Sequence, residues 1–85
     1  MKQDPEMTPR EKDVRMMQSP LEWPLMVLPL KKADFTVGFM PGTGCKVYVG
    51  NLYDQRFMQM IRDGNVEPVE YESFGAIYDD GWRVD

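Results

Sequence analysis

The fold is decided by the stretch from residue 34 to residue 50, which reads DFTVGFMPGTGCKVYVG. Its two halves, residues 34–40 and 45–50, are rich in β-branched and aromatic side chains, which favour extended strands. Between them stands Pro-Gly-Thr-Gly at 41–44, a combination that reverses the direction of a chain. The stretch therefore predicts a β-hairpin.

A further strand is predicted immediately upstream, at residues 25–30. Pro29 has no N–H to donate to a sheet ladder, so we expect this strand to lie at an edge of the sheet. Exposed strand edges invite pairing with another chain. A homodimer that closes along residues 25–30 is therefore one hypothesis. In the hairpin that follows, alternation predicts Phe35, Val37 and Phe39 on one face.

The sequence at the amino end predicts a short helix. Thr8 can cap it, Pro9 suits its first position, and Glu11 can complete a capping box. The predicted helix, from about Pro9 to Gln18, has few apolar residues, so it either docks on the domain or forms when a partner binds. We expect residues 1–7 to be flexible and describe residues 1–19 as a loose tail with a marginal helix.

Residues 20–85 are predicted to form a single α+β domain. Asp54 and Ser73 can each cap a helix, and Gly64 and Gly81 are suited to end these helices. Short extended segments are expected at 66–71 and 82–84. The predicted architecture is a small three- to four-stranded, mostly antiparallel sheet with two or three short helices.

Composition bounds the setting of the protein. The 85 residues include one cysteine, Cys45, and a lone cysteine cannot form an internal disulfide. Small secreted domains are commonly stapled by disulfides, so we expect a reducing, cytoplasmic location. No apolar run approaches the roughly 18 residues that crossing a membrane requires, so we expect a soluble protein without a membrane partner.

The chain contains no histidine, which removes the commonest general base and a usual ligand of zinc. Without a neighbouring base, Cys45 is expected to be a small core residue rather than a nucleophile. We therefore expect a non-enzymatic protein with no metal, cofactor or small-molecule substrate.

Acidity is concentrated in the last third of the chain. The net charge is −4, and residues 51–85 carry eight acids against three arginines. This distribution disfavours a nucleic-acid partner and favours a basic protein partner. The candidate partner-binding acids are Glu67, Glu70, Glu72, Asp79 and Asp80. An alternative hypothesis is an inhibitor that mimics nucleic acid with these carboxylates.

Apolar candidates for partner binding lie near the amino end. Met16 and Met17 stand on the predicted helix, and Trp23 follows it. Methionine adapts to varied surfaces and tryptophan often anchors interfaces, although both also fill cores. The leading hypothesis is a protein-binding or assembly protein that presents residues 14–23 or the acidic residues 67–80. Its partner would be another protein or a second copy of the chain.

Residues 47–52, VYVGNL, are similar to the first ribonucleoprotein motif of RNA-recognition-motif domains. In that family an aromatic residue of a central strand stacks on a base, a role that the resemblance implies for Tyr48. The second motif of the family is absent, and 33 residues remain after Leu52. A small RNA-binding module is the third hypothesis. In size and acidity the chain also resembles small accessory proteins encoded by bacteriophages and other mobile elements, a likeness that carries no motif.

Overall fold

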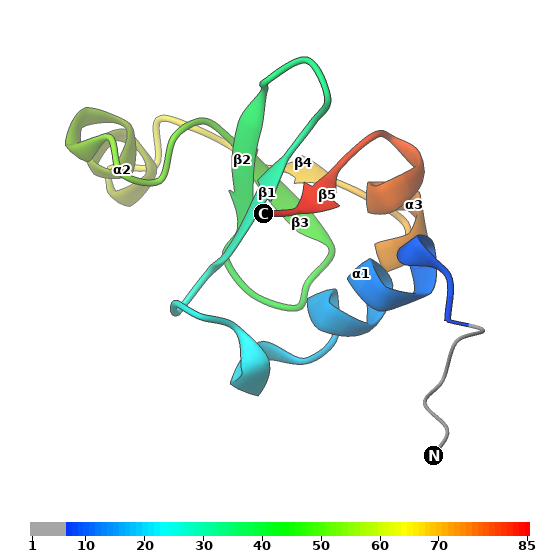
Figure 1. Ribbon diagram of the computed structural model, residues 1–85. Helices are drawn as coiled ribbons and strands as arrows, with labels where there is room; N and C mark the ends of the chain where they lie inside the picture. The colour runs from blue at the N-terminus through cyan, green and yellow to red at the C-terminus, as the bar shows by residue number, and fades with distance from the viewer. Residues whose placement is uncertain (1–6) are drawn as a thin grey trace.

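The structure, a computed structural model, describes residues 7–85, which form an α+β domain with a five-stranded antiparallel sheet (Figure 1). The strands follow the spatial order β4-β3-β2-β1-β5. The elements in chain order are α1 (Pro9–Met17), the 3₁₀ turn η1 (Pro20–Glu22), β1 (Leu28–Lys31), β2 (Val37–Met40), β3 (Lys46–Val49), α2 (Gln55–Arg62), β4 (Val69–Glu70), α3 (Phe74–Asp79) and β5 (Arg83–Val84). The predicted class is confirmed. The strand number exceeds the predicted three to four because the two-residue strands β4 and β5 both pair with the sheet.

Strand β1 lies inside the sheet, between β2 and β5, so the prediction that it forms an edge is wrong. Pro29 is tolerated there because of the side toward which its backbone polar atoms point. Its carbonyl oxygen accepts from the backbone N–H of Asp85 at 3.0 Å and therefore points away from β2. The nitrogen of a strand residue points to the same side as its carbonyl, so the missing N–H of Pro29 does not interrupt the ladder with β2. The strand edge on which the hypothesis of a homodimer along residues 25–30 rests is therefore occupied by β5 at Leu30 and Lys31.

The predicted hairpin of β2 and β3 is confirmed, with Gly38 opposite Val49 and Phe39 opposite Tyr48. Phe35 does not join β2 as predicted. It has a φ of 71° and is almost fully exposed at the tip of the β1–β2 turn. The turn takes Phe35 out of the strand because Lys32 N–H donates to the Thr36 carbonyl at 2.8 Å, and Thr36 N–H donates to an Asp34 carboxylate oxygen at 3.0 Å.

Helix α1, in the segment predicted to be a loose tail with a marginal helix, docks on the domain, which is one of the two alternatives that the sequence left open for it. Its capping box of Thr8 and Glu11 forms as predicted. Met17 is completely buried in the core, and the Asp13 carboxylate accepts from the backbone N–H of Val84 at 3.0 Å. The expected flexibility of residues 1–7 falls mostly on residues 1–6, which lie outside the described part of the chain.

The two faces of the sheet are covered unequally. One face packs against α1 and α3, which lie side by side (Figure 1), and carries the main core. That core consists of Met17, Trp23, Leu28, Leu30, Met40, Val47, Ile77 and Trp82. On the other face Phe39 stacks on Tyr48, with ring centroids 5.5 Å apart, and meets Phe57 of α2 edge-on at 6.2 Å. No helix of the described part of the chain covers the rest of that face.

Helix α2 projects from the end of the sheet opposite α1 and α3 (Figure 1). Asp54 caps it as predicted, with a carboxylate oxygen 2.9 Å from the backbone nitrogen of Arg56. Phe57 holds it to the sheet by lying on Gly50, where a Cβ would come within 2.4 Å of the ring. All side chains of α2 remain at least partly exposed. Among the described helices, none has the length and apolarity needed to cross a bilayer.

Candidate functional site

A groove of about 450 Å³ lies over the part of the sheet that α2 leaves uncovered. Its floor includes Pro29 of β1 and Val37 of β2, its walls Leu25 and Tyr53. Val37 and Leu25 are each about two-fifths exposed, and Tyr53 is 74% exposed. Among the described residues that line the groove, Asp85 is the one with a charged side chain, and it pairs with Lys31 at 3.2 Å.

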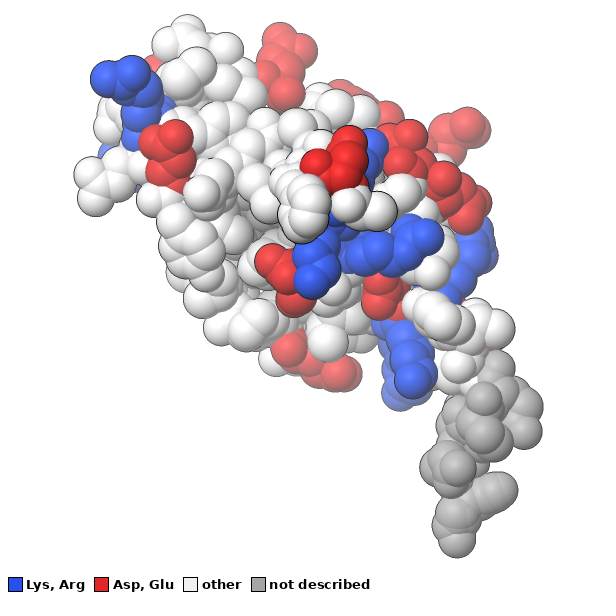
Figure 2. All heavy atoms as spheres, turned by 45° about the horizontal axis from the view of Figure 1, so that its top comes forward, with Lys and Arg blue, Asp and Glu red and all other residues white. Residues whose placement is uncertain are grey.

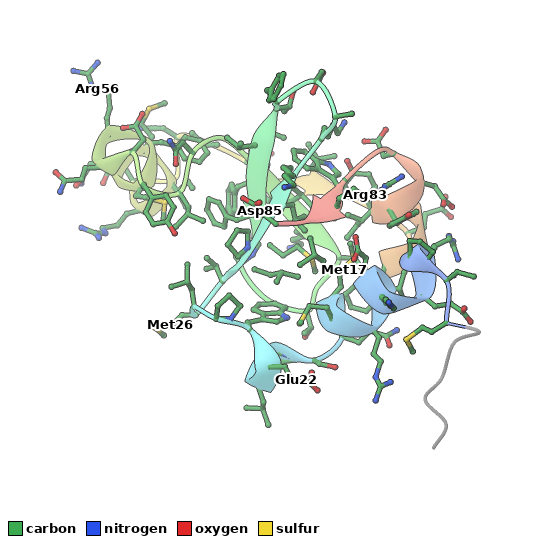
Figure 3. The ribbon with its side chains drawn as sticks, viewed as in Figure 1. Met17, Glu22, Met26, Arg56, Arg83 and Asp85 are labelled. Carbon is green, nitrogen blue, oxygen red and sulfur yellow. The ribbon has the colours of Figure 1, made fainter. Side chains whose placement is uncertain are left out.

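A loop beside the groove carries the most exposed apolar side chains of the described region. Leu21 is fully exposed and Met26 is 95% exposed. Figure 3 shows Met26 pointing away from the body of the molecule, in contrast to Met17, which points toward the sheet. We refer to the loop 20–27 and the groove together as the groove face, with the apolar side chains Leu21, Pro24, Leu25, Met26, Val37 and Tyr53.

The loop is held in place by Trp23, one of the predicted binding residues. Trp23 is only 8% exposed, and its indole N–H donates to the Met16 carbonyl oxygen at 2.6 Å. Glu22 N–H donates to the Ser19 carbonyl at 2.9 Å, which closes the 3₁₀ turn. These bonds hold residues 20–23 against the end of α1.

The predicted apolar binding residues are thus placed in or near the core. Met17 and Trp23 are buried, so their side chains do not form an accessible surface, whereas Met16 is partly exposed and packs against the core cluster. The apolar residues that are accessible, Leu21 and Met26, were missed. One signal in the sequence could have indicated them. Pro20 and Pro24 have no backbone N–H, which marks a segment that does not pair in a sheet, and the apolar side chains of such a segment need not face the core.

The five predicted acids are all exposed, and they divide into two groups. Asp79 forms a two-pronged ion pair with Arg10, at 3.0 and 3.1 Å, and Asp80 accepts from the Tyr71 hydroxyl at 2.6 Å. These two carboxylates tie α3 to α1 and to β4, and their charge is largely matched by Arg10 and Lys32. The second group, Glu67, Glu70 and Glu72, lies along β4 and its flanks.

Tyr48, the residue that the ribonucleoprotein resemblance singles out, is half-buried. One face of its ring stacks on Phe39, with the two ring planes 30° apart. This contact gives the aromatic side chain of β3 a packing role in the small cluster that holds α2.

A hydrogen-bonded chain of Trp82, Tyr71 and Asp80 joins the core to the surface. The Trp82 indole N–H donates to the Tyr71 hydroxyl at 3.1 Å, and that hydroxyl donates to Asp80. The hydrogen bond from Tyr71, together with the nearby Lys32 ammonium, lowers the pKa of Asp80. The pKa of Tyr71 is raised, first by its partial burial and then by the Asp80 carboxylate.

Tyr71→Phe is expected to lower the free energy of unfolding at pH 7 by about 1 to 3 kcal/mol, because the buried Trp82 N–H loses its acceptor. It should also weaken the dependence of the free energy of unfolding on pH in the acidic range. The folded pKa of Asp80 lies below its unfolded value of about 3.9, so its stabilisation is present above that pH and is lost as the pH falls through the folded pKa. Tyr71→Phe removes the largest cause of that shift.

The measurement is urea unfolding at pH values from 7 to 2. Tyr53→Phe is the matched control, since the Tyr53 side chain is mostly exposed, and it should follow the wild-type curve. Parallel pH profiles for wild type and Tyr71→Phe would contradict the assigned role of the Tyr71–Asp80 bond.

Within residues 7–85, no group of three or more cysteine, aspartate or glutamate side chains is arranged to hold a metal ion. Cys45 is half-buried, packs against the core and has a φ of 59°. Comparisons with protein-family models, with curated proteins and with solved structures find no match to this chain.

Proposed function

We propose that this chain is a non-enzymatic protein-binding or assembly protein that acts through its groove face. The observation that carries the proposal is that loop 20–27 exposes Leu21 and Met26 and also lines the apolar part of the groove with Pro24 and Leu25. Contiguous apolar surface is costly to leave in water and commonly marks a site that another protein covers. As part of the proposal we place the protein in a reducing cytoplasm, which suits its unpaired Cys45.

The distribution of charge supports the same surface. Figure 2 shows a broad stretch free of Lys, Arg, Asp and Glu on the visible side of the molecule that carries α2, while acidic side chains gather toward the opposite end. Protein interfaces have cores depleted in charge and enriched in aromatic residues and methionine. Tyr53 and Met26 fit that composition.

The acidic alternative, an inhibitor that mimics nucleic acid, receives less support. A mimic needs carboxylates free to meet a basic groove, but Asp79 and Asp80 are engaged with Arg10 and Lys32. Glu67, Glu70 and Glu72 remain for such a role. Binding through these three would weaken steeply with salt, whereas binding through an apolar face would weaken little.

The test is capture of protein by the tagged full-length chain from its native host, quantified for wild type and three variants. Tyr53→Asp, on the groove face, should reduce the captured protein, whether another species or untagged copies of the chain, by at least about tenfold. Phe35→Asp, an exposed aromatic position outside the groove, and Glu70→Lys should retain capture. Loss with Glu70→Lys but not with Tyr53→Asp would replace the proposal with the acidic alternative.

A further inference from the structure

The dipeptide Asp-Gly occurs twice in the chain, at residues 63–64 and 80–81. Each copy ends a helix. Asp63 follows α2 with a φ of −81° and a ψ of −3°, and Asp80 follows α3 with a φ of −81° and a ψ of 2°. Both aspartates are exposed. The local backbone is therefore the same at the two places, so a difference in their chemistry has to come from their surroundings.

An aspartate followed by glycine can rearrange without an enzyme, because glycine has no side chain to shield its backbone nitrogen. That nitrogen attacks the side-chain carboxyl carbon of the aspartate. A C–N bond forms while the carboxyl hydroxyl and the amide hydrogen leave together as water, and the product is a five-membered succinimide. Water then opens the ring. When it adds to the former main-chain carbonyl, the product is isoaspartate, whose main chain continues through the side-chain carbon, with no net change of mass.

We propose that Asp63 is a site of spontaneous isoaspartate formation in the folded protein, and that the packing around Asp80 protects the second Asp-Gly. For the ring to close, the glycine N–H has to leave its hydrogen bond to the helix, and the last turn has to open. The rate therefore follows the free energy of local opening, which varies widely within one protein. Neither site belongs to the groove face, so this proposal stands apart from the proposed function.

The end of α2 can open at little cost. Each side chain of α2 is at least partly exposed, and the space where a Cβ of Gly64 would stand is open. Residues 65–68, which follow, form an irregular segment. The Asp63 carboxylate accepts from the Gln59 side-chain amide at 3.3 Å, a bond within the same helix end that opens with it. Opening this turn therefore exposes little of the core.

The end of α3, in contrast, is held by the core. The residue after Gly81 is Trp82, which is 1% exposed, and the strand β5 that follows pairs with β1. The Asp80 carboxylate accepts from the Tyr71 hydroxyl at 2.6 Å and lies 3.5 Å from the Lys32 ammonium. These two groups also lower the pKa of Asp80, which leaves less of the protonated form whose hydroxyl can depart. Opening this turn disturbs the buried indole and breaks the bonds to the carboxylate.

The rearrangement at Asp63 alters the end of α2 and keeps the net charge. Isoaspartate lengthens the main chain by one carbon atom and retains one free carboxylate. The Gly64 N–H donates to the Ile61 carbonyl at 3.0 Å, and the Asn65 N–H donates to the Met60 carbonyl at 2.8 Å. The added carbon displaces both N–H groups from these carbonyls. We therefore expect the last turn of α2 to fray while the core stays folded.

The experiment is incubation of the full-length chain at neutral pH in water enriched in the heavy isotope of oxygen, followed by digestion and mass spectrometry. Opening of the succinimide places one solvent oxygen atom in the peptide, and chromatography separates aspartate from isoaspartate. The peptide that contains Asp63 should acquire the label at least about tenfold faster than the peptide that contains Asp80. In urea that unfolds the chain, the two rates should become comparable, because the packing is then absent.

Two variants test the assignment. Asp63→Glu should abolish isoaspartate at position 63 and leave the rate at Asp80 unchanged, since a glutamate would have to close a less favourable six-membered ring. Tyr71→Phe removes the hydroxyl that holds Asp80, so it should raise the rate at Asp80 by at least about threefold and leave the rate at Asp63 unchanged. Circular dichroism checks that both variants fold.

Equal rates at the two sites in the folded chain, or a faster rate at Asp80, would overturn the proposal. A peptide containing Asp63 that stays unlabelled in the folded chain would also overturn it. An unchanged rate at Asp80 in Tyr71→Phe would contradict the protection assigned to the Tyr71–Asp80 bond.

Discussion

Trp82→Ala is expected to lower the free energy of unfolding by about 3 to 5 kcal/mol, the range for removing a buried tryptophan. Trp82 is 1% exposed and its ring lies against Gly38, where an added Cβ would stand 2.9 Å from the ring. The Lys32 ammonium lies 4.8 Å from the ring centroid, and the indole N–H is bonded to Tyr71. The free energy of unfolding of a native protein is about 5 to 15 kcal/mol in total, so this variant should be largely unfolded under mild denaturing conditions.

The measurement is urea unfolding followed by circular dichroism, which does not depend on the indole that is removed. Trp82→Phe is the matched control. It keeps most of the ring contacts but cannot donate to the Tyr71 hydroxyl, so its loss should be distinctly smaller than that of the alanine variant. A Trp82→Ala protein within about 1 kcal/mol of wild type would show that the sheet face under α3 is not packed as described.

Met17→Ala is expected to cost about 2 to 5 kcal/mol, the range for truncating a buried methionine to alanine. Met17 is the residue of α1 that is completely buried, and its side chain joins the core formed by the sheet and α3. The loss therefore measures how firmly α1 belongs to the domain.

Met26→Ala is the control for this second prediction, since Met26 is almost fully exposed and should change stability by less than about 0.5 kcal/mol. Thermal and urea unfolding of both variants give the comparison. Equal stabilities of Met17→Ala and wild type would mean that α1 contributes little to the stability of the folded state. The prediction of a loose tail at residues 1–19 would then be the better description.

Local signals in the sequence were reliable because each acts within a few residues. Thr8 and Glu11 form the predicted capping box, and Asp54 and Ser73 cap α2 and α3. Gly64 and Gly81 have φ values of 78° and 106°, as expected of residues that end helices. These features depend on side chains that bond to nearby backbone, so a single sequence is enough to predict them.

Features that depend on contacts between distant residues were not predictable in the same way. The position of β1 inside the sheet depends on β5, which lies about fifty residues downstream and has two residues. The pairing of Asp79 with Arg10 spans 69 residues. The sequence showed where the acidic residues stand in the chain, but not which of them form ion pairs with distant residues.

The candidate site was anticipated in kind but not in its residues. The sequence pointed to an apolar segment near Trp23, and the accessible apolar residues do lie there. The sequence could not indicate which side chains of the loop point inward and which point outward, because a loop bounded by prolines has no regular alternation of buried and exposed positions. Trp23 and Met17 point inward since α1 and the loop fold back onto the sheet, and only the packed structure settles that direction.

The hydrogen bond between Asp13 and Val84 spans 71 residues and has a consequence for how the protein is made. During translation, α1 leaves the ribosome long before the strand that will accept it. The hairpins of β1, β2 and β3 pair locally and can form first, because short loops close at small entropy cost. We therefore expect nascent chains to expose Met17 until residues near 84 have emerged, an interval in which they are open to chaperones and proteases.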